Sequence, residues 1–321
     1  MIARIRALEA RGHRRSIGIG LAAATALVSG FSVFVNASAV RAFGDPVLFT
    51  TLKNGVAAVV LVAIALAVVD RAPARVRSLS PRSLAGLAVI GVVGGGIPFV
   101  LFFTGLANAS APAAALIHKT LFVWVALLAA VLLRERLGGL QIGALAVLVV
   151  AQLLILPADG LAWTAGEWMI AAATGMWAVE VIVAKRLLRD VPSPVAAAAR
   201  MGIGLVLLLG YVAISGGLAG IGALGMEQWA WVLLTGGLLS AYVASWYAAL
   251  RRAPASAVTA ILTLGAPITA ALQLVANGQV PAPTALAGHG AVLAAGVVIA
   301  WLALRPAGAT AKGAAASSVA A

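Results

Sequence analysis

FVLFFTGLANASAPAAAL, residues 99–116, aligns without a gap with VASWYAALRRAPASAVTA, residues 243–260, at an offset of 144 positions. In this alignment the aromatic pair 102–103 lies over the aromatic pair 246–247, and each segment continues with alanine next to proline. Internal sequence symmetry at such a separation indicates that the chain contains two copies of one structural unit.

A second alignment supports the same repeat. KNGVAAVVLVA, which begins at Lys53, lies over RMGIGLVLLLG, which begins at Arg200, at an offset of 147. Each segment starts with a basic residue and has glycine in third place. The register is therefore kept across residue types that differ in size and charge, which chance similarity between apolar helices does not explain.

The composition places both copies in a membrane. Of the 321 residues, 63% are hydrophobic and 10% are charged, whereas a soluble domain has roughly 25% charged residues. Apolar runs of about 20 residues, the length that spans a bilayer as a helix, recur along the chain. We predict ten spans, at 17–40, 46–69, 83–106, 110–133, 138–157, 164–187, 194–215, 227–250, 254–277 and 283–304.

Five spans per copy is an odd number, so the second copy enters the membrane in the opposite direction to the first. The sequence therefore predicts an all-α integral membrane protein with ten transmembrane helices arranged as two inverted five-helix repeats. The predicted parts are a basic cytoplasmic N-terminus at 1–16, the repeats at 17–157 and 158–304, and a disordered cytoplasmic tail at 305–321. Inverted repeats are typical of secondary transporters, whose substrate site lies near the midplane between the halves.

Basic residues give the expected orientation. With ten spans, 18 of the 22 lysines and arginines fall in segments on one side of the membrane, and only Arg41 falls in a loop on the other side. Because positive charge collects in short cytoplasmic loops, we expect both termini in the cytoplasm and a multi-pass protein of the inner (plasma) membrane. We read the first span as retained in the mature protein.

The net charge of +13 is explained by these loops, so no nucleic-acid partner is expected. The chain has no cysteine and three histidines, which gives no pattern of metal ligands. No cofactor is predicted.

The segment APAAALIHKTLFVWVALLAAVLLRERL, residues 111–137, has a run of small residues that ends in an L-x-E-R-L turn. With this segment, the ten spans and the early basic residues Lys53 and Arg200, the chain resembles the EamA-type transporters of the drug/metabolite transporter superfamily. The resemblance covers residues 17–304 and implies a metabolite transporter, commonly an exporter, that works by alternating access. The second copy departs from the family pattern, because Gln279 lies where Glu135 lies in the first.

Two polar residues interrupt the fourth span. His118 and Lys119 lie roughly 12–14 Å below its outer end at 1.5 Å per residue, close to the midplane of a core about 30 Å thick. A lysine there that faced lipid would cost at least about 3 kcal/mol. We therefore expect Lys119 to line a water-filled transport cavity. His118 either lines it too or bonds a backbone carbonyl, and its titration near neutral pH leaves coupling to a proton open.

Other intramembrane polar residues have competing explanations. Glu180, the carboxylate within a span, lies at nearly the same depth as Arg200, so we predict a structural ion pair between them that leaves Lys119 without a carboxylate. Lys53 either extends to the membrane surface or bonds Asn36, and a role in helix packing is favoured.

Aromatic and helix-weakening residues complete the candidate site. Trp177, Tyr242, Phe99 and Trp124 lie within a few turns of the midplane. Packing is the ordinary explanation, but the polar groups of tryptophan and tyrosine need partners, so we include all four as substrate-binding candidates. Hinge residues are expected where glycine or proline weakens a span, although small residues also serve close helix packing. The hinge candidates are Gly95, Gly96, Pro98 and Pro267.

The predicted function is a secondary transporter, expected to be an exporter, that moves small metabolites by alternating access through a central cavity at the midplane. Amino acids and related zwitterions are favoured because Lys119 would attract a carboxylate and the aromatic residues an apolar side chain. An integral membrane enzyme acting on a lipid-linked substrate is the second class, and product formation would reveal it. A channel or scaffold is the third, and ohmic conduction would distinguish a channel. A monomer and a homodimer are both compatible with the sequence.

Overall fold

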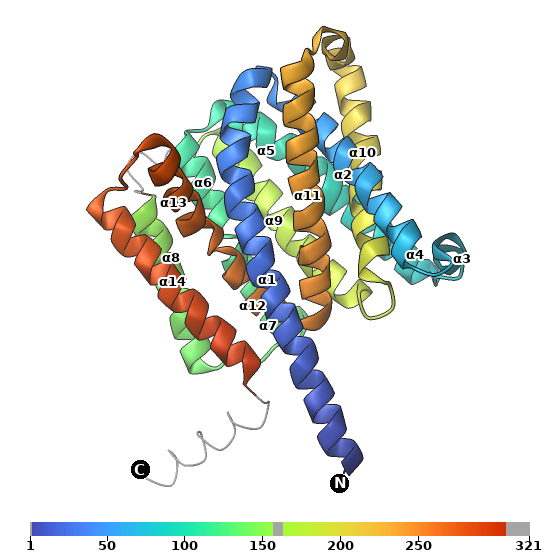
Figure 1. Cartoon of the computed structure of the whole chain (residues 1–321), viewed down its shortest axis with the longest axis vertical. Coiled ribbons are helices and arrows are strands. Elements are labelled where there is room, and N and C mark those ends of the chain that lie inside the picture. The colour runs from blue at the N-terminus through green and yellow to red at the C-terminus, as the bar shows by residue number, and fades with distance from the viewer. Residues whose placement is uncertain (1, 157–162, 306–321) are drawn as a thin grey trace.

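The computed structural model describes residues 2–156 and 163–305 (Figure 1). Within these ranges all regular secondary structure is helical. The helices are α1 (Ile2–Phe43), α2 (Pro46–Val68), α3 (Ala72–Arg77), α4 (Pro81–Val89), the π-helix η1 (Ile90–Gly96), α5 (Ile97–Asn108), α6 (Ala111–Lys119), α7 (Leu121–Leu132), α8 (Gly139–Ile155), α9 (Ala165–Leu187), α10 (Ser193–Ile214), the 3₁₀ helix η2 (Gly217–Ala223), α11 (Met226–Arg252), α12 (Ala255–Leu262), α13 (Gly265–Asn277) and α14 (Pro283–Leu304).

The prediction of an all-α membrane protein with ten helical spans is confirmed. In the part of the chain that the structure describes, nine helical segments have the length and hydropathy of a membrane span, and α8 is a shorter apolar helix of 17 residues. A helix of 17 residues is at the lower limit for crossing a bilayer. The third span is built from α4, η1 and α5, the fourth from α6 and α7, and the ninth from α12 and α13.

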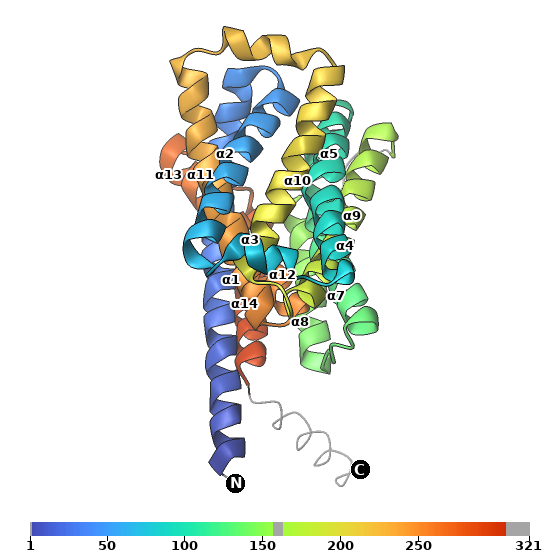
Figure 2. The same ribbon diagram turned by 90° about the vertical axis from the view of Figure 1, so that its right-hand side faces the viewer.

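Both described ends of the chain lie at the same face of the molecule, where α1 begins and α14 ends (Figures 1 and 2). We call this the termini face and the opposite one the far face. Helix α1 begins at Ile2, so residues 2–16 of the predicted basic segment are helical and continuous with the first span. Of the predicted tail at 305–321, only Arg305 lies within the described residues.

Local sequence signals set where the spans begin. Asp45 caps α2, because its carboxylate accepts hydrogen bonds from the backbone N–H groups of Val47 (2.9 Å) and Leu48 (3.0 Å). Pro46 takes the first helical position, where no N–H is needed. Ser110 caps α6 in the same manner through the N–H of Ala113. These caps lie at the Asp-Pro and Ser-Ala-Pro sequences between apolar runs.

The packing of the helices follows a pseudo-twofold relation between the two copies. Helix α2 packs on its counterpart α10, and α8 packs on its counterpart α14. The first span of one copy packs on the third span of the other in both directions, since α1 lies against α11 and α9 lies against α5. Each copy therefore completes the other, as an inverted repeat requires.

Glycine allows the closest of these contacts. A Cβ atom added to Gly95 of η1 would lie 2.0 Å from the carbonyl oxygen of Arg200 in α10, and one added to Gly204 would lie 2.3 Å from the carbonyl carbon of Gly95. The two backbones are thus in direct contact, which only residues without a side chain permit. The glycines at the centre of the third span therefore do serve close packing.

This contact gives a first prediction. Gly204→Ala is expected to lower the thermal stability of the purified protein, since overpacking costs about 1–3 kcal/mol. Gly202→Ala is the matched control, because a Cβ at Gly202 meets nothing within 4 Å. Melting curves in one detergent compare the two. Equal melting temperatures for both variants would contradict the contact.

The fourth and ninth spans are interrupted at equivalent places. Helix α6 ends at Lys119 and α7 begins at Leu121, while α12 ends at Leu262 and α13 begins at Gly265. At each break a threonine hydroxyl donates to the carbonyl three residues earlier, from Thr120 (2.7 Å) and from Thr263 (2.6 Å). Such bonds bend helices. Interrupted helices in corresponding positions of two repeats are a mark of transporter binding sites.

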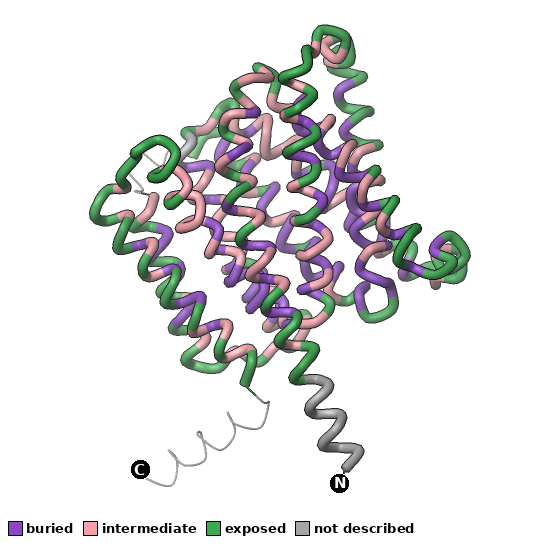
Figure 3. Tube along the Cα trace, in the orientation of Figure 1, coloured by how far each residue is buried: buried purple, intermediate pink, exposed green. Residues whose placement is uncertain are grey.

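The half of the bundle nearer the termini face holds much of the dry core (Figure 3). Buried side chains from both copies form one apolar cluster that extends from the central part of the bundle to the termini-side ends of the spans. Its members at the termini-side ends of the spans include Ile182, Ala184, Leu187, Leu188, Ala249, Leu250, Ala253, Ala255, Ala257 and Val258.

Candidate functional site

A cavity of about 290 Å³ lies between the two copies. Its wall combines three cationic side chains, one carboxylate, an imidazole, a cluster of aromatic rings and several hydroxyls. The lining residues are Ser29, Ser32, Val33, Asn36, Lys53, Phe99, Phe102, Phe103, His118, Lys119, Leu121, Phe122, Trp177, Glu180, Val181, Arg200, Leu239, Tyr242, Val243, Trp246, Thr259, Leu262 and Thr263. We call it the central cavity.

The central cavity occupies the middle of the membrane and the half towards the far face. Lys53 lies seven residues after the far-face start of α2, which is about 10 Å of helix. Arg200 lies seven residues after the termini-face start of α10, at about the same depth from the opposite side. The buried apolar cluster described above lies between Arg200 and the termini-side ends of the spans. We infer that this cluster seals the central cavity on the termini side.

His118 and Lys119 both line the central cavity, at the break between α6 and α7. Within the residues that the structure describes, Lys119 has neither a hydrogen-bond acceptor nor a carboxylate at bonding distance. The His118 ring packs against Phe102 (centroids 5.2 Å apart) and Trp177 (5.1 Å), and its Nδ1 is buried without a hydrogen bond to a described residue. Among the described residues, no backbone carbonyl accepts a hydrogen bond from His118, so the second explanation for this residue is not observed.

Lys53 lies closer to the far face and is better satisfied than Lys119. Its Nζ donates a long hydrogen bond to Asn36 Oδ1 (3.4 Å) and lies 5.0 Å from the ring centroid of Phe49 and 5.7 Å from that of Phe103. Ammonium groups at such distances are attracted by the faces of aromatic rings. Of the two explanations that the sequence offered for Lys53, the bond to Asn36 is the one present. Lys53 nevertheless also lines the cavity.

Glu180 and Arg200 form an ion pair at the floor of the cavity. Arg200 Nε lies 3.6 Å from Glu180 Oε1, and the hydroxyl of Tyr247 donates a hydrogen bond to the same oxygen. Arg200 also lies over the ring of Phe99, 5.8 Å from its centroid. Both charged side chains are nearly buried. Because one carboxylate is shared between a guanidinium and a phenol, it is not free to neutralise Lys119.

The aromatic candidates divide into three that line the central cavity and one that does not. Trp177 donates from Nε1 to the carbonyl of Gly94 (3.0 Å) and meets Phe99 edge-on. Tyr242 stacks on Trp246 with centroids 6.1 Å apart. The fourth candidate, Trp124, is 51% exposed on the outside of α7 and donates to Thr120 Oγ1.

The structure thus places Trp124 away from the central cavity. Depth fixes the position of a residue along its span but does not fix the face of the helix on which it lies. On the observed α7 the cavity is met by Leu121 and Phe122, while Trp124 lies on the outer surface.

The hinge candidates lie at the irregular parts of the spans. Gly95 and Gly96 end the π-helix η1, Pro98 is in the first turn of α5, and Pro267 is in the first turn of α13 just after the break. Their place at irregular backbone is a property of the structure, and their role in gating stays a prediction.

Three polar side chains tie helices together below the cavity on the termini side. Glu135 and Arg186 join the two copies, and Lys185 joins two helices of the second copy. Glu135 accepts hydrogen bonds from the N–H groups of Ala255 (2.7 Å) and Ser256 (3.2 Å) at the start of α12. Lys185 donates to the carbonyls of Leu250 (2.5 Å) and Ala253 (2.6 Å) at the end of α11. Arg186 donates to the carbonyl of Leu132, at 2.6 Å.

Comparison with known proteins agrees with this architecture. The EamA-like transporter family matches the chain twice, at residues 16–156 and at residues 164–301. The chain belongs to this family. It is a multi-pass membrane protein that transports small molecules, and the family places it among transporters and not among enzymes. The predicted repeat boundaries, 17–157 and 158–304, stay a prediction.

A related protein comes from Streptantibioticus cattleyicolor and is described as a probable terminal-alkyne amino-acid exporter. It is 32% identical over 229 residues, which is 71% of this chain and 76% of that protein. A crystal structure aligns with a TM-score of 0.69 and 20% identity over 88% of this chain and 97% of that one. At this identity the second likeness shows the fold alone.

Several cavity residues of this EamA-like chain were missed by reasoning from the sequence. Phe102, Phe103 and Trp246 line the cavity. The alignment of the aromatic pairs 102–103 and 246–247 across the repeat could have indicated them. Tyr247, the partner of Glu180, was part of the same alignment. Thr259 and Thr263 had no signal of their own, because threonine is common in membrane helices. The equivalence of Lys119 and Thr263 at an offset of 144 could have indicated Thr263.

Proposed function

We propose that the chain exports small zwitterionic metabolites, amino acids foremost, by alternating access through the central cavity. The observation that carries this proposal is the ammonium group of Lys119, which lines the cavity without a carboxylate partner among the described residues. A substrate carboxylate would supply the missing partner. Charge-assisted hydrogen bonds of this kind are among the strongest that proteins make.

The rest of the cavity wall supports a small amphipathic substrate. Its volume, about 290 Å³, is near the lower end of the roughly 300–1,000 Å³ typical of ligand pockets. Phe99, Phe102 and Trp177 give one apolar wall beside the ammonium group. An amino acid with an apolar side chain matches both features, and the description of the relative from Streptantibioticus cattleyicolor names an amino acid as its cargo.

The seal on the termini side suggests how access alternates. In this state the substrate reaches the cavity from the far face. Export requires a second state in which the contacts of Glu135, Lys185 and Arg186 separate and the cavity opens at the termini face. The breaks at Thr120 and Thr263, which lie at the level of the cavity, provide places at which the helices can bend.

The orientation follows from the charge distribution. The termini face carries most of the basic residues, so we assign it to the cytoplasm and the far face to the exterior of a plasma membrane. Coupling to a proton stays a prediction. The cavity groups that could carry the proton are His118 and Glu180; the other titratable groups in its wall are the two lysines, Arg200 and Tyr242. The choice between a monomer and a homodimer is untested as well.

The experiment is a transport assay in proteoliposomes with three matched compounds. These are an apolar amino acid, its amide, which lacks the carboxylate, and its N-acetyl derivative, which lacks the ammonium group. The amino acid is expected to be transported and the amide to be transported at least about tenfold more slowly, because Lys119 then stays unpaired. Equal rates for the amino acid and its amide would overturn the assignment of Lys119 to the carboxylate. Protein-free liposomes are the control.

A further inference from the structure

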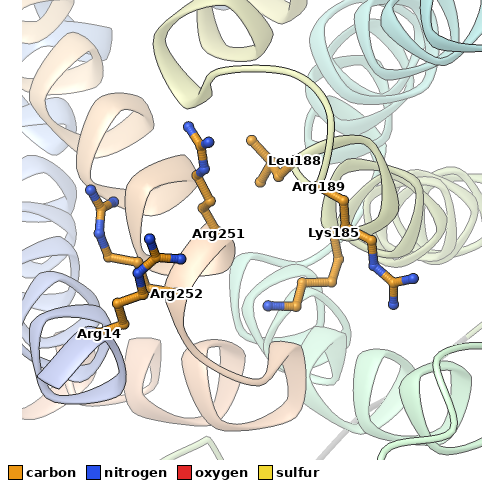
Figure 4. A pocket seen from close by; sticks show the side chains of 6 residues that line it. All are labelled: Arg14, Lys185, Leu188, Arg189, Arg251 and Arg252. Atoms are coloured by element: carbon orange, nitrogen blue, oxygen red, sulfur yellow. The ribbon is translucent and has the colours of Figure 1, made fainter. Parts of the chain in front are cut away.

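A second cavity, of about 770 Å³, lies at the termini face. It is formed by the beginning of α1, the end of α9 and the end of α11 (Figure 4). Five of the six side chains that line it are cationic, and the sixth is an almost completely buried leucine. We call it the basic cavity, and its residues are Arg14, Lys185, Leu188, Arg189, Arg251 and Arg252.

Two of the five cationic groups of the basic cavity are held in place by hydrogen bonds, and no described carboxylate neutralises the five. Lys185 is fixed by the carbonyls of Leu250 and Ala253, and Arg252 Nη1 donates to the carbonyl of Ala248 (2.8 Å). Among the side chains that the structure describes, at 12–110, 113–156 and 163–305, none of the five makes an ion pair. The carbonyl oxygens orient Lys185 and Arg252, but they carry no formal charge and so do not neutralise these side chains.

The carboxylate of Glu135 does not pair with the cationic side chains of the basic cavity, because it is bonded elsewhere. Its two oxygens accept three hydrogen bonds from α12, from the N–H groups of Ala255 and Ser256 and from the hydroxyl of Ser256 (2.6 Å). It therefore caps a helix start, where a negative charge is already favoured by the helix dipole. Asp190 follows Arg189 in the chain but does not line the cavity.

The general preference for basic residues on the cytoplasmic side accounts for charge at this face, but not for its concentration in one hollow. Arg77, Arg82 and Arg136 satisfy the same preference from positions outside the basic cavity. Five like charges that line one space repel one another, so an anion in that space stabilises their arrangement.

We propose that the basic cavity binds a phosphate-bearing anion, either the headgroup of an acidic phospholipid or a soluble phosphate. Several arginines suit such a ligand, since the guanidinium group binds phosphate oxygens in pairs. The position also fits, because the cavity lies where three spans end and therefore at the depth of the headgroups. Basic pockets between membrane helices on the cytoplasmic side are known to take such headgroups.

Binding there has a consequence for transport that rests on the proposed function. Arg14, Arg251 and Arg252 lie on one side of the hollow and Lys185, Leu188 and Arg189 on the other (Figure 4). An anion between them joins α1 and α11 to α9. These helices must separate when the cavity opens at the termini face, so the bound anion favours the sealed state.

The test measures binding, so that it does not depend on transport. The purified full-length protein is placed in phosphatidylcholine nanodiscs, without addition, with inorganic phosphate, or with a minor fraction of phosphatidylglycerol. Thermal stability and the number of co-purified phospholipids are measured. We expect a rise in melting temperature with at least one anion. A rise with phosphatidylglycerol alone assigns the site to a lipid, and a rise with inorganic phosphate assigns it to a soluble ligand.

Two triple variants make the result specific to the basic cavity. Arg14→Gln, Arg251→Gln and Arg252→Gln together are expected to weaken anion binding about 100-fold, since each basic residue near a membrane surface contributes about fivefold. Arg77→Gln, Arg82→Gln and Arg136→Gln remove the same charge from the same face and are expected to leave binding unchanged.

A third variant shows whether a loss of anion binding comes from the removed charge or from misfolding. Replacing Arg14, Arg251 and Arg252 by lysine keeps the charge, so this variant is expected to retain most of the binding. The proposal is overturned if no anion raises the melting temperature of the unmodified protein. It is equally overturned if the two glutamine variants bind anions with the same affinity.

Discussion

Lys119→Ala is expected to lower the apparent affinity for a zwitterionic substrate by about 30-fold or more. The substrate carboxylate would lose its charged partner in a mostly apolar cavity, and the loss of one member of a buried charge pair costs about 2–5 kcal/mol. Lys119→Arg keeps the positive charge and is expected to retain measurable transport. The measurement is the concentration dependence of amino-acid transport into proteoliposomes.

Trp124→Ala is the matched control for this variant. Trp124 lies in the same span, about one helical turn from Lys119, but on the outer surface of α7. It is expected to transport with unchanged affinity. If Lys119→Ala transports every carboxylated substrate as the unmodified protein does, Lys119 has no part in binding the substrate.

The ion pair at the floor of the cavity gives the second large effect. Glu180→Gln removes the carboxylate and leaves the guanidinium of Arg200 nearly buried and without its charged partner. Breaking a buried pair in this way destabilises a protein by about 3–5 kcal/mol. The melting temperature of the variant in detergent is therefore expected to fall by several degrees.

The double variant with Glu180→Gln and Arg200→Met tests whether the pair itself is responsible. Replacement of both charges by residues of similar size is often neutral, so most of the lost stability is expected to return. A structural role predicts that transport returns with stability. If stability returns but transport does not, the pair takes part in binding or coupling, and the structural assignment is wrong.

Much of the fold could be predicted because it depends on features that one sequence displays. Apolar runs between proline, glycine and aspartate signals gave the spans to within a few residues. The alignment of 99–116 with 243–260 gave the repeat, and an odd number of spans per copy gave the inversion. The spans and their ends depend on the surrounding lipid and on local capping, which act on each helix separately.

The interruptions of the spans could not be predicted in the same way. The π-helix at Ile90–Gly96 includes Gly95, whose backbone meets that of Gly204 on another helix, and such a contact exists only in the folded protein. The break at Thr120 depends on a side chain that donates to its own helix, as threonines also do in the unbroken stretches of α9 and α11.

Site residues could be predicted from the sequence where any other placement of the side chain would cost a large free energy. A lysine in the middle of a span must avoid lipid, and Lys119 does line a cavity. A carboxylate and a guanidinium at equal depth should meet, and Glu180 and Arg200 are in contact. Aromatic residues carry no such penalty, because tryptophan is stable both against lipid and in a cavity. For that reason depth alone does not distinguish Trp177, which lines the cavity, from Trp124, which is exposed on α7.

The central claim is that a water-filled cavity between the copies opens to the far face and is sealed at the termini face. The most direct measurement is the reaction of single cysteines with a membrane-impermeant thiol reagent. The chain contains no cysteine, so each introduced one reports without background. Ser32→Cys lines the cavity, and Ala26→Cys, on the same helix, is the control because Ala26 is buried outside it.

In vesicles that expose the far face, Ser32→Cys is expected to react rapidly and to be protected by a transported amino acid, while Ala26→Cys stays unreactive. In inverted vesicles without substrate, Ser32→Cys is expected to react far more slowly. Reaction of Ser32→Cys at equal rates from both faces, or from neither, would contradict the sealed cavity on which this account of transport depends.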